Sequence, residues 1–127
     1  MKKLLIVDDD RSLLSYLESE LREVGFSVKS SDNGADAIVT AAEEEFDLIL
    51  LDMLMPGLDG IQVVRVLRKI SPHIPVIGLT GYVGRGYMSQ AQSLGVSLLT
   101  KPIEIQTLIS EIKDTIKQAE ETNVQTS

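Results

Sequence analysis

The chain has 127 residues, of which 19 are acidic and 12 are basic, so its net charge at pH 7 is −7. This length suits a single domain that buries a core without a structural metal, and the absence of cysteine excludes a disulfide framework, thiolate catalysis and cysteine-ligated zinc. The negative charge repels a polyanionic backbone, which argues against nucleic acid as a direct partner and favours protein partners or a small cation.

The N-terminus carries only four apolar residues, Leu4 to Val7, between two lysines and three aspartates. This run is too short for the core of a signal peptide and far too short to span a membrane. We therefore expect a cytoplasmic protein that does not associate with membranes.

Strand and helix patterns alternate five times along the chain. Short apolar runs predict strands, and apolar residues at helical spacing predict a helix after each of them. The predicted strands are residues 4–7, 26–30, 47–51, 76–79 and 97–99, and the predicted helices are residues 13–24, 35–45, 61–70, 87–94 and 105–116. Gly25 suits the end of the first helix, and three glycines between residues 81 and 86 predict a late start for the fourth.

The domain is predicted to span residues 2–118, and the polar residues 119–127 are predicted to form a flexible C-terminal tail. Short apolar runs that alternate with helices are typical of strands buried on both faces of a parallel sheet. Because crossovers between parallel strands are right-handed, five such units predict an α/β fold, a three-layer doubly wound sandwich. The common strand order is 2-1-3-4-5, which reverses between strands one and three.

Reactive polar residues follow four of the five predicted strands. Asp8 and Asp9 follow the first, Asp52 the third, Thr80 the fourth and Lys101 the fifth. Parallel strands present their carboxyl ends on one edge, where open α/β sheets bind their ligands. The sequence therefore predicts one site made of acids, a hydroxyl and a lysine.

The predicted acids need a compensating charge. Two like charges about 4 Å apart repel by roughly 4 kcal/mol at an effective dielectric constant near 20. Oxygen ligands without histidine or cysteine suit a hard cation, and Mg²⁺ is favoured over Zn²⁺. A carboxylate beside a divalent cation, an ammonium and a hydroxyl resembles a phosphoryl-transfer site, with Asp52 as the nucleophile.

The four runs LLIVDDD, LILLDMLMPGLDG, VIGLTGY and LLTKP, at these separations, resemble the receiver domain of two-component response regulators. The resemblance covers nearly the whole chain and implies the flavodoxin-like receiver fold. It also implies that Asp52 is the phosphoacceptor, that Asp9 is a direct metal ligand, and that Asp8 acts largely through water.

The same resemblance implies that the backbone carbonyl of Leu54 is the third protein ligand of the metal. It implies that Thr80 and Lys101 contact phosphoryl oxygens, and that the peptide bond before Pro102 is cis, a common state only for bonds to proline.

Three features depart from the family pattern. Leu98 occupies a position that is aromatic in many receivers and rotates inward on activation. The segment before it, from Gly95, is about one residue shorter than usual, which puts the choice of partner in doubt. The apolar Leu54 and Tyr82 occupy positions that influence how water reaches the phosphoryl group, and we hypothesise that they slow hydrolysis.

Each signal also has a structural interpretation. Asp8 to Asp10 could provide the N-cap and first-turn charges of the first helix, and Asp10 is interpreted as such a cap. Met53 and Met55 are interpreted as packing residues, and His73 as a surface residue. Tyr87 could either pack or report on the state of its loop.

The predicted function is a stand-alone signalling switch, not a metabolic enzyme. It accepts a phosphoryl group on Asp52, with Mg²⁺, from a histidine kinase or a histidine phosphotransfer protein. It would catalyse its own phosphorylation and slow dephosphorylation, and signal to a downstream protein through the surface of the fourth helix, fifth strand and fifth helix, as a monomer or weak homodimer.

Two other functions stay open. One is a pseudo-receiver, an interaction module that is not phosphorylated. The other is a Mg²⁺-dependent phosphohydrolase with an aspartyl-phosphate intermediate, which would normally need a second acid at the position of Leu54.

Overall fold

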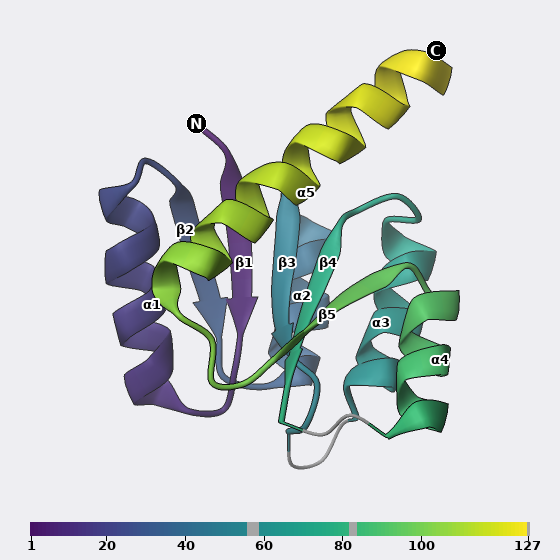
Figure 1. Cartoon of the computed structure of the whole chain (residues 1–127), viewed down its shortest axis with the longest axis horizontal. Coiled ribbons are helices and arrows are strands. Elements are labelled where there is room, and N and C mark those ends of the chain that lie inside the picture. The colour runs from purple at the N-terminus through teal and green to yellow at the C-terminus, as the bar shows by residue number, and fades with distance from the viewer. Residues whose placement is uncertain (56–58, 82–83, 127) are drawn as a thin grey trace.

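The computed structural model describes residues 1–55, 59–81 and 84–126. Five parallel strands form one sheet in the order β2-β1-β3-β4-β5, with helices on both faces (Figure 1). In chain order the elements are β1 (Lys3–Val7), α1 (Arg11–Glu23), β2 (Ser27–Ser31), α2 (Gly34–Glu43), β3 (Leu48–Asp52), α3 (Gly60–Ile70), β4 (Val76–Thr80), α4 (Arg85–Ser93), β5 (Val96–Thr100) and α5 (Ile105–Thr126). The predicted fold class and strand order are confirmed.

Two apolar layers hold the sandwich together. One packs α1 and α5 against one face of the sheet, and the other packs α2, α3 and α4 against the opposite face. Alternate residues of the central strands serve the two layers, so that Leu4 and Leu50 face the first and Leu5 and Ile49 face the second. Every residue of β3 and β4 is buried, which explains why their sequences are continuous apolar runs.

Short polar residues begin three of the helices. The side chains of Asp10, Asn33 and Asp59 accept hydrogen bonds from backbone N–H groups in the first turns of α1, α2 and α3. Gly25 follows α1 with φ of +103°, a conformation that favours glycine. The predicted roles of Asp10 and Gly25 are confirmed.

The backbone of the predicted C-terminal tail is helical, because α5 continues through residue 119 to Thr126, and the flexibility of residues 119–127 stays a prediction. Residues 117–121 are Lys-Gln-Ala-Glu-Glu, which favour helices, and Glu120 forms an ion pair with Lys2. Residues 120–122 of this helix are exposed, so it needs no apolar side chains there. The domain limits of 2–118 stay a prediction.

Other differences are small. The helix α4 begins at Arg85, two residues earlier than predicted, because Gly84 provides its N-cap and the Met88 N–H donates to the Gly84 carbonyl at 3.0 Å. The two methionines of the β3–α3 loop pack in the core, as predicted, with Met53 fully buried and Met55 8% exposed. His73 is exposed, also as predicted.

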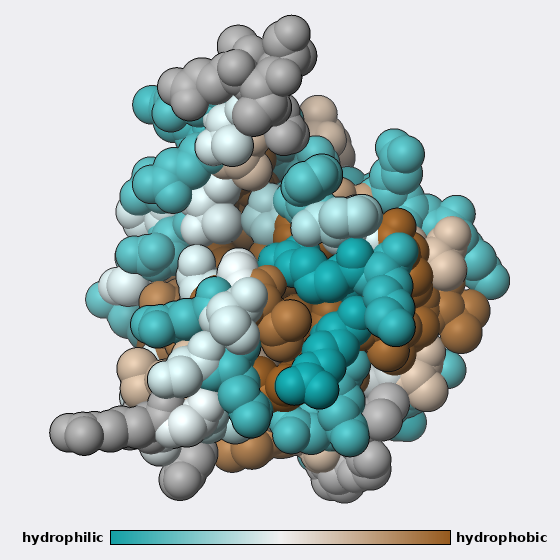
Figure 2. All heavy atoms as spheres, turned by 90° about the vertical axis from the view of Figure 1, so that its right-hand side faces the viewer, coloured by the Kyte–Doolittle hydropathy of each residue, from teal (hydrophilic) through white to brown (hydrophobic). Residues whose placement is uncertain are grey.

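The side of the molecule on which α3 and α4 lie is mixed in character. Figure 2 shows hydrophilic side chains there among exposed hydrophobic ones. On α3, Val66 and Ile70 are exposed beside the charged Arg65 and Lys69. Among the described residues, no helix is both long enough and apolar enough to cross a membrane.

Candidate functional site

The carboxyl ends of the strands bring the predicted polar residues to one edge of the sheet. Asp8 directly follows β1, Asp52 is the last residue of β3, Thr80 ends β4 and Lys101 follows β5. The register pairs Val7 with Leu51, so the acids that follow these two residues extend from neighbouring strands. Topology alone therefore gathers residues that are far apart in sequence.

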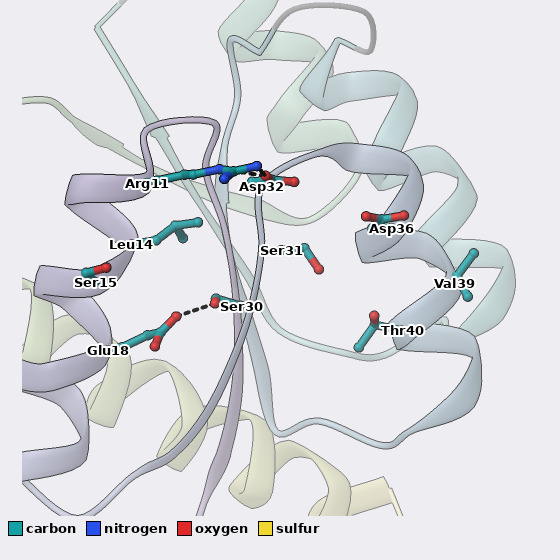
Figure 3. Close-up of a pocket in the computed structure, with 10 residues that line it drawn as sticks. All are labelled: Arg11, Leu14, Ser15, Glu18, Ser30, Ser31, Asp32, Asp36, Val39 and Thr40. Atoms are coloured by element: carbon teal, nitrogen blue, oxygen red, sulfur yellow. Dashed lines mark hydrogen bonds and ion pairs between the residues drawn. The ribbon is translucent and has the colours of Figure 1, made fainter.

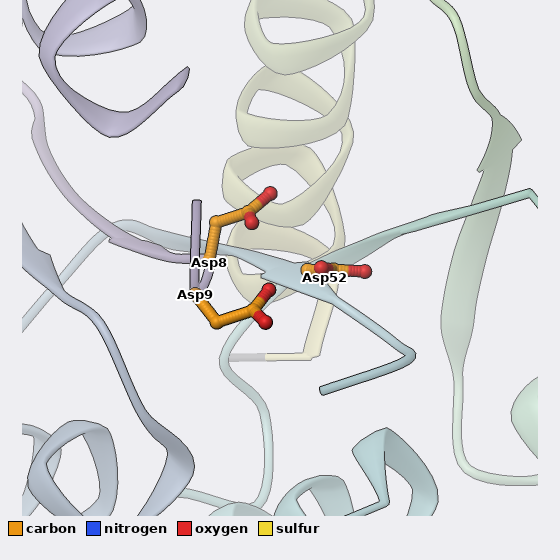
Figure 4. A group of neighbouring side chains, drawn as sticks. All are labelled: Asp8, Asp9 and Asp52. Carbon is orange, nitrogen blue, oxygen red and sulfur yellow. The ribbon is translucent and has the colours of Figure 1, made fainter. Parts of the chain in front are cut away.

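Three carboxylates form the centre of this edge. One oxygen each from Asp8, Asp9 and Asp52 lies within 4.8 Å of the other two (Figure 4). Asp8 and Asp52 are buried, with 3% and 6% of their surface exposed, whereas Asp9 is exposed. Two of the three acids therefore lose most of their contact with water, and one stays open to it.

Lys101 supplies a positive charge to the two buried acids. Its Nζ lies 3.2 Å from Oδ2 of Asp8 and 3.4 Å from Oδ2 of Asp52. Burial lowers the pKa of Lys101, but its hydrogen bond to Asp8 and the charge of Asp52 outweigh burial, so the net shift of this pKa is upward. Lys101 is therefore protonated when it faces the acids.

Backbone N–H groups hold the same carboxylates. The N–H of Leu54 donates to Oδ1 of Asp52 at 3.2 Å, and the N–H of Asp10 donates to Oδ1 of Asp8 at 2.9 Å. Asp52 thus has one oxygen directed at a backbone amide and the other directed at Lys101. The orientation of its carboxylate is fixed from both sides.

Burial raises the pKa of Asp52 above its ordinary value of 3.8. The Leu54 N–H opposes this rise, the charge of Asp8 adds to it, and Lys101 opposes it again. Desolvation and repulsion by a second acid therefore outweigh the stabilising partners of the Asp52 anion.

Thr80 and the lysine that follows β5 are linked through the backbone. The N–H of Lys101 donates to the Thr80 carbonyl at 2.9 Å, and Thr80 is only 1% exposed. The Lys101–Pro102 peptide bond is cis, as the resemblance implied. The structure thus brings Asp8, Asp9, Asp52 and Lys101 together, with Thr80 at the end of the adjacent strand, while their chemical roles stay predictions.

The donor set fits a divalent hard cation. Three carboxylates and one ammonium leave a net charge of −2 on this edge. Each carboxylate offers the cation an oxygen atom. The side chain of Leu54 is 51% exposed beside these acids, whereas Tyr82, the other residue predicted to slow hydrolysis, lies outside the described residues.

The structure adds a contact that the sequence did not predict. The hydroxyl of Tyr87 on α4 donates to the backbone carbonyl of Met53 at 2.9 Å, one residue after Asp52. Burial raises the pKa of Tyr87 to about 12. The charges of Asp59 and Asp52 and a hydrogen bond with Asp59 contribute to the same rise. No sequence signal marks this contact, because a side chain that meets a backbone carbonyl leaves no pattern.

A groove of about 510 Å³ lies elsewhere, between α1, β2 and α2 (Figure 3). Two pairs of its polar residues bond to each other: Arg11 pairs with Asp32 at 2.8 Å, and the Ser30 hydroxyl donates to Glu18. The groove contains none of Asp8, Asp9, Asp52, Thr80 and Lys101. The carboxyl edge of the central strands is therefore the stronger candidate site.

Comparisons with known proteins agree with this geometry. The sequence profile of the response regulator receiver domain matches residues 4–113. The chain is 32% identical over 114 residues to the response regulator receiver protein CpdR of Brucella abortus, which covers 89% of this chain and 95% of CpdR. It is 36% identical over 116 residues to the uncharacterized transcriptional regulatory protein YkoG of Bacillus subtilis. The aligned residues cover 91% of this chain but only 51% of YkoG.

Solved structures give the same result. A CheY-like receiver domain protein from Methanospirillum hungatei superposes with a TM-score of 0.93 at 25% identity, covering 96% of this chain and 98% of the other. The chemotaxis protein CheY4 of Vibrio cholerae superposes with a TM-score of 0.85 at 26% identity, covering 91% and 98%. Receiver domains are signalling switches that bind Mg²⁺ in an acidic pocket and interact with histidine kinases or phosphotransfer proteins. The chain belongs to the response regulator receiver domain family.

Proposed function

We propose that this chain accepts a phosphoryl group on Asp52 from the phosphohistidine of a histidine kinase or histidine phosphotransfer protein. The observation that supports this most directly is the position of the Asp52 carboxylate. It is buried at the end of β3, with Oδ2 3.4 Å from Lys101 Nζ and with carboxylate oxygens of Asp8 and Asp9 within 4.8 Å.

The transfer forms one bond and breaks one. A carboxylate oxygen of Asp52 attacks phosphorus, the new O–P bond forms, and the P–N bond to the donor imidazole breaks. The imidazole nitrogen leaves with the electron pair and takes a proton from solvent. Lys101 faces the attacking carboxylate, and its charge stabilises the negative charge that spreads over the phosphoryl oxygens.

Mg²⁺ is the metal that the donor set fits. We propose that Asp9, Asp52 and the backbone carbonyl of Leu54 hold it directly and that Asp8 holds it through water. When bound, the metal supplies positive charge that offsets the charge of the transferring oxygens. Lys101 already spans Asp8 and Asp52, so this edge holds its acids in position before either ligand arrives.

Signalling is proposed to follow from contacts that exist only in the phosphorylated state. Thr80 and Lys101 would each contact a phosphoryl oxygen, and this shifts the population of the segment between β4 and α4. The output surface is α4, β5 and α5, and the downstream partner is a protein. We propose that the chain works in the cytoplasm, without direct contact to nucleic acid or membrane, as a monomer or weak homodimer.

The reverse reaction is proposed to be slow. Hydrolysis needs a water molecule to attack phosphorus and to break the O–P bond, which restores the Asp52 carboxylate. The exposed apolar side chain of Leu54 offers this water no hydrogen-bond partner. A phosphorylated half-life as short as that of fast chemotaxis receivers would contradict this part of the proposal.

The experiment is incubation with acetyl phosphate and Mg²⁺, followed by intact-mass measurement. We expect wild type and Asp114→Asn, which changes an exposed aspartate on α5, to gain one labile phosphoryl group. We expect Asp52→Asn, or wild type with the metal chelated, to gain none. An adduct that persists in Asp52→Asn would overturn the assignment, and no adduct from either acetyl phosphate or a histidine kinase would show an unphosphorylated interaction module.

A further inference from the structure

A single peptide unit joins the phosphoacceptor to α4. The carbonyl of Met53 and the N–H of Leu54 belong to the same planar amide. Its N–H donates to Oδ1 of Asp52 at 3.2 Å, and its carbonyl accepts from the Tyr87 hydroxyl at 2.9 Å and from the Gly60 N–H at 3.0 Å. The carboxylate and the helix are therefore bonded to opposite sides of one amide.

Close packing fixes the position of this amide. The side chain of Met53 is fully buried and fills the space above two glycines. A Cβ atom at Gly60 would lie 2.6 Å from Met53 Cα, and one at Gly78 would lie 2.8 Å from Met53 Sδ. Because the amide has little room to move, a change at Asp52 reaches Tyr87 mainly as a change in hydrogen-bond strength.

The hydrogen bonds on the two sides of this amide strengthen each other. An anionic acceptor at the N–H side of an amide polarises it and makes its carbonyl a better acceptor. A phenol is protonated at neutral pH, so the Tyr87 hydroxyl can donate to that carbonyl. The bond from α4 to Met53 is therefore strongest while Asp52 is an ionised carboxylate.

The two ends of α4 are held differently. The hydroxyl of Tyr87, in its first turn, bonds to the Met53 carbonyl and to Asp59, whereas Arg68 of α3 donates to the carbonyls of Leu94 at 2.8 Å and Gly95 at 3.4 Å, just beyond its last turn. Gly84 provides the N-cap but no side-chain hydrogen bond. A weaker bond to Met53 would thus shift the Tyr87 hydroxyl towards Asp59 and loosen the beginning of α4, while Arg68 still holds its end.

We propose that Tyr87 is a positioning residue that transmits the state of Asp52 to α4 through the Met53–Leu54 amide. The inference rests on the proposed function. When the carboxylate becomes an acyl phosphate, the Leu54 N–H loses an anionic acceptor, the Met53 carbonyl becomes a weaker acceptor, and the first turn of α4 is held less tightly. This route needs no aromatic residue on β5, where the chain has Leu98.

The first experiment measures binding of beryllofluoride, a phosphoryl mimic, in the presence of Mg²⁺. Because the coupling is reciprocal, removing the Tyr87 hydroxyl favours the complexed state. Tyr87→Phe, which keeps the ring, is expected to bind beryllofluoride about three to ten times more tightly, the factor of one net hydrogen bond. Tyr16→Phe, at a 49% exposed tyrosine on α1, is the matched control and is expected to bind as wild type does. Unchanged or weaker binding by Tyr87→Phe overturns the proposal.

The second experiment does not depend on phosphorylation. Asp52→Asn replaces the anionic acceptor with a neutral amide, so we expect the Met88 N–H, which bonds to Gly84 in the first turn of α4, to exchange with solvent at least about three times faster. Tyr87→Phe is expected to have the same effect, and Asp114→Asn none. If wild type binds no beryllofluoride, the proposed function fails while this measurement still tests the relay. Unchanged exchange in Asp52→Asn overturns the relay.

Discussion

The carboxyl ends of β1 and β3 differ in physical character from the neighbouring positions Gly78 of β4 and Leu98 of β5. At the first, Asp8 and Asp52 are buried charges held by Lys101 and by backbone N–H groups. In the second, the side chains of Met53 and Leu98 lie so close to Gly78 that a Cβ atom there would be within 2.9 Å of both. The first region should therefore respond to changes of charge at constant size, and the second to changes of size at constant charge.

Replacing the lysine at the acidic edge is expected to have the largest effect. Lys101→Met keeps the length of the side chain but removes the charge that faces Asp8 and Asp52. We expect phosphorylation of Asp52 by acetyl phosphate to slow about 100-fold, the usual cost of losing one group that stabilises developing negative charge. Lys113→Met, at an exposed position of α5, is the control. A change of less than threefold in Lys101→Met would contradict the electrostatic role.

A methyl group in the second region is expected to affect stability. In Gly78→Ala the new Cβ would lie 2.8 Å from Met53 Cγ and 2.9 Å from Leu98 Cδ2, so both side chains must shift. We expect the free energy of unfolding in urea to fall by about 1–3 kcal/mol. In the matched change Gly86→Ala, on α4, the Cβ meets nothing within 4 Å, and stability should instead rise by about 1 kcal/mol. Equal changes in the free energy of unfolding of the two variants would contradict the close packing at Gly78.

The pH dependence tests the buried charge of Asp52. Burial raises the pKa of Asp52 in the folded chain, so the ionised form destabilises the fold at neutral pH, and this cost disappears as pH falls through the raised pKa towards 3.8. Without metal, Asp52→Asn should therefore be more stable than wild type at neutral pH and lose this advantage on acidification. Urea unfolding of both proteins across this range measures the difference. If the stability of Asp52→Asn relative to wild type increases on acidification, the raised pKa of Asp52 is contradicted.

The smallest effect is expected at the rim of the site. Leu54→Ser replaces an exposed apolar side chain beside Asp52 with a hydroxyl that can hold a water molecule. Hydrolysis of phosphorylated Asp52 should become a few times faster, as measured by loss of the mass adduct after the donor is removed. Val66→Ser, at an exposed valine of α3, should leave the half-life unchanged.

The fold was predictable because its strands alternate regularly with amphipathic helices. The apolar runs of β1, β3 and β4 mark buried parallel strands, and polar residues at their ends mark the shared edge. Element ends were less predictable. Glycine suggested a late start for α4, and polarity suggested a tail after residue 118, whereas α4 begins at Arg85 and α5 continues to Thr126.

The site was predictable to the extent that topology determines it. Asp8, Asp9, Asp52 and Lys101 meet because their strands are parallel and end at the same edge of one sheet, and a sequence pattern is enough to infer that. The bond from Tyr87 to the Met53 carbonyl depends on the rotation of α4 and on one buried methionine. Neither quantity follows from periodicity, so Tyr87 could be assigned either to packing or to signalling before the structure was known.

The most direct test of the account is the crystal structure of the chain with Mg²⁺ and beryllofluoride. We predict beryllium bonded to a carboxylate oxygen of Asp52, fluorine atoms in contact with Thr80 and Lys101, and a distance between Tyr87 Oη and the Met53 carbonyl longer than the present 2.9 Å. Beryllofluoride bound away from Asp52 would contradict the proposed function. An adduct on Asp52 with the Tyr87 bond unchanged would contradict the relay to α4.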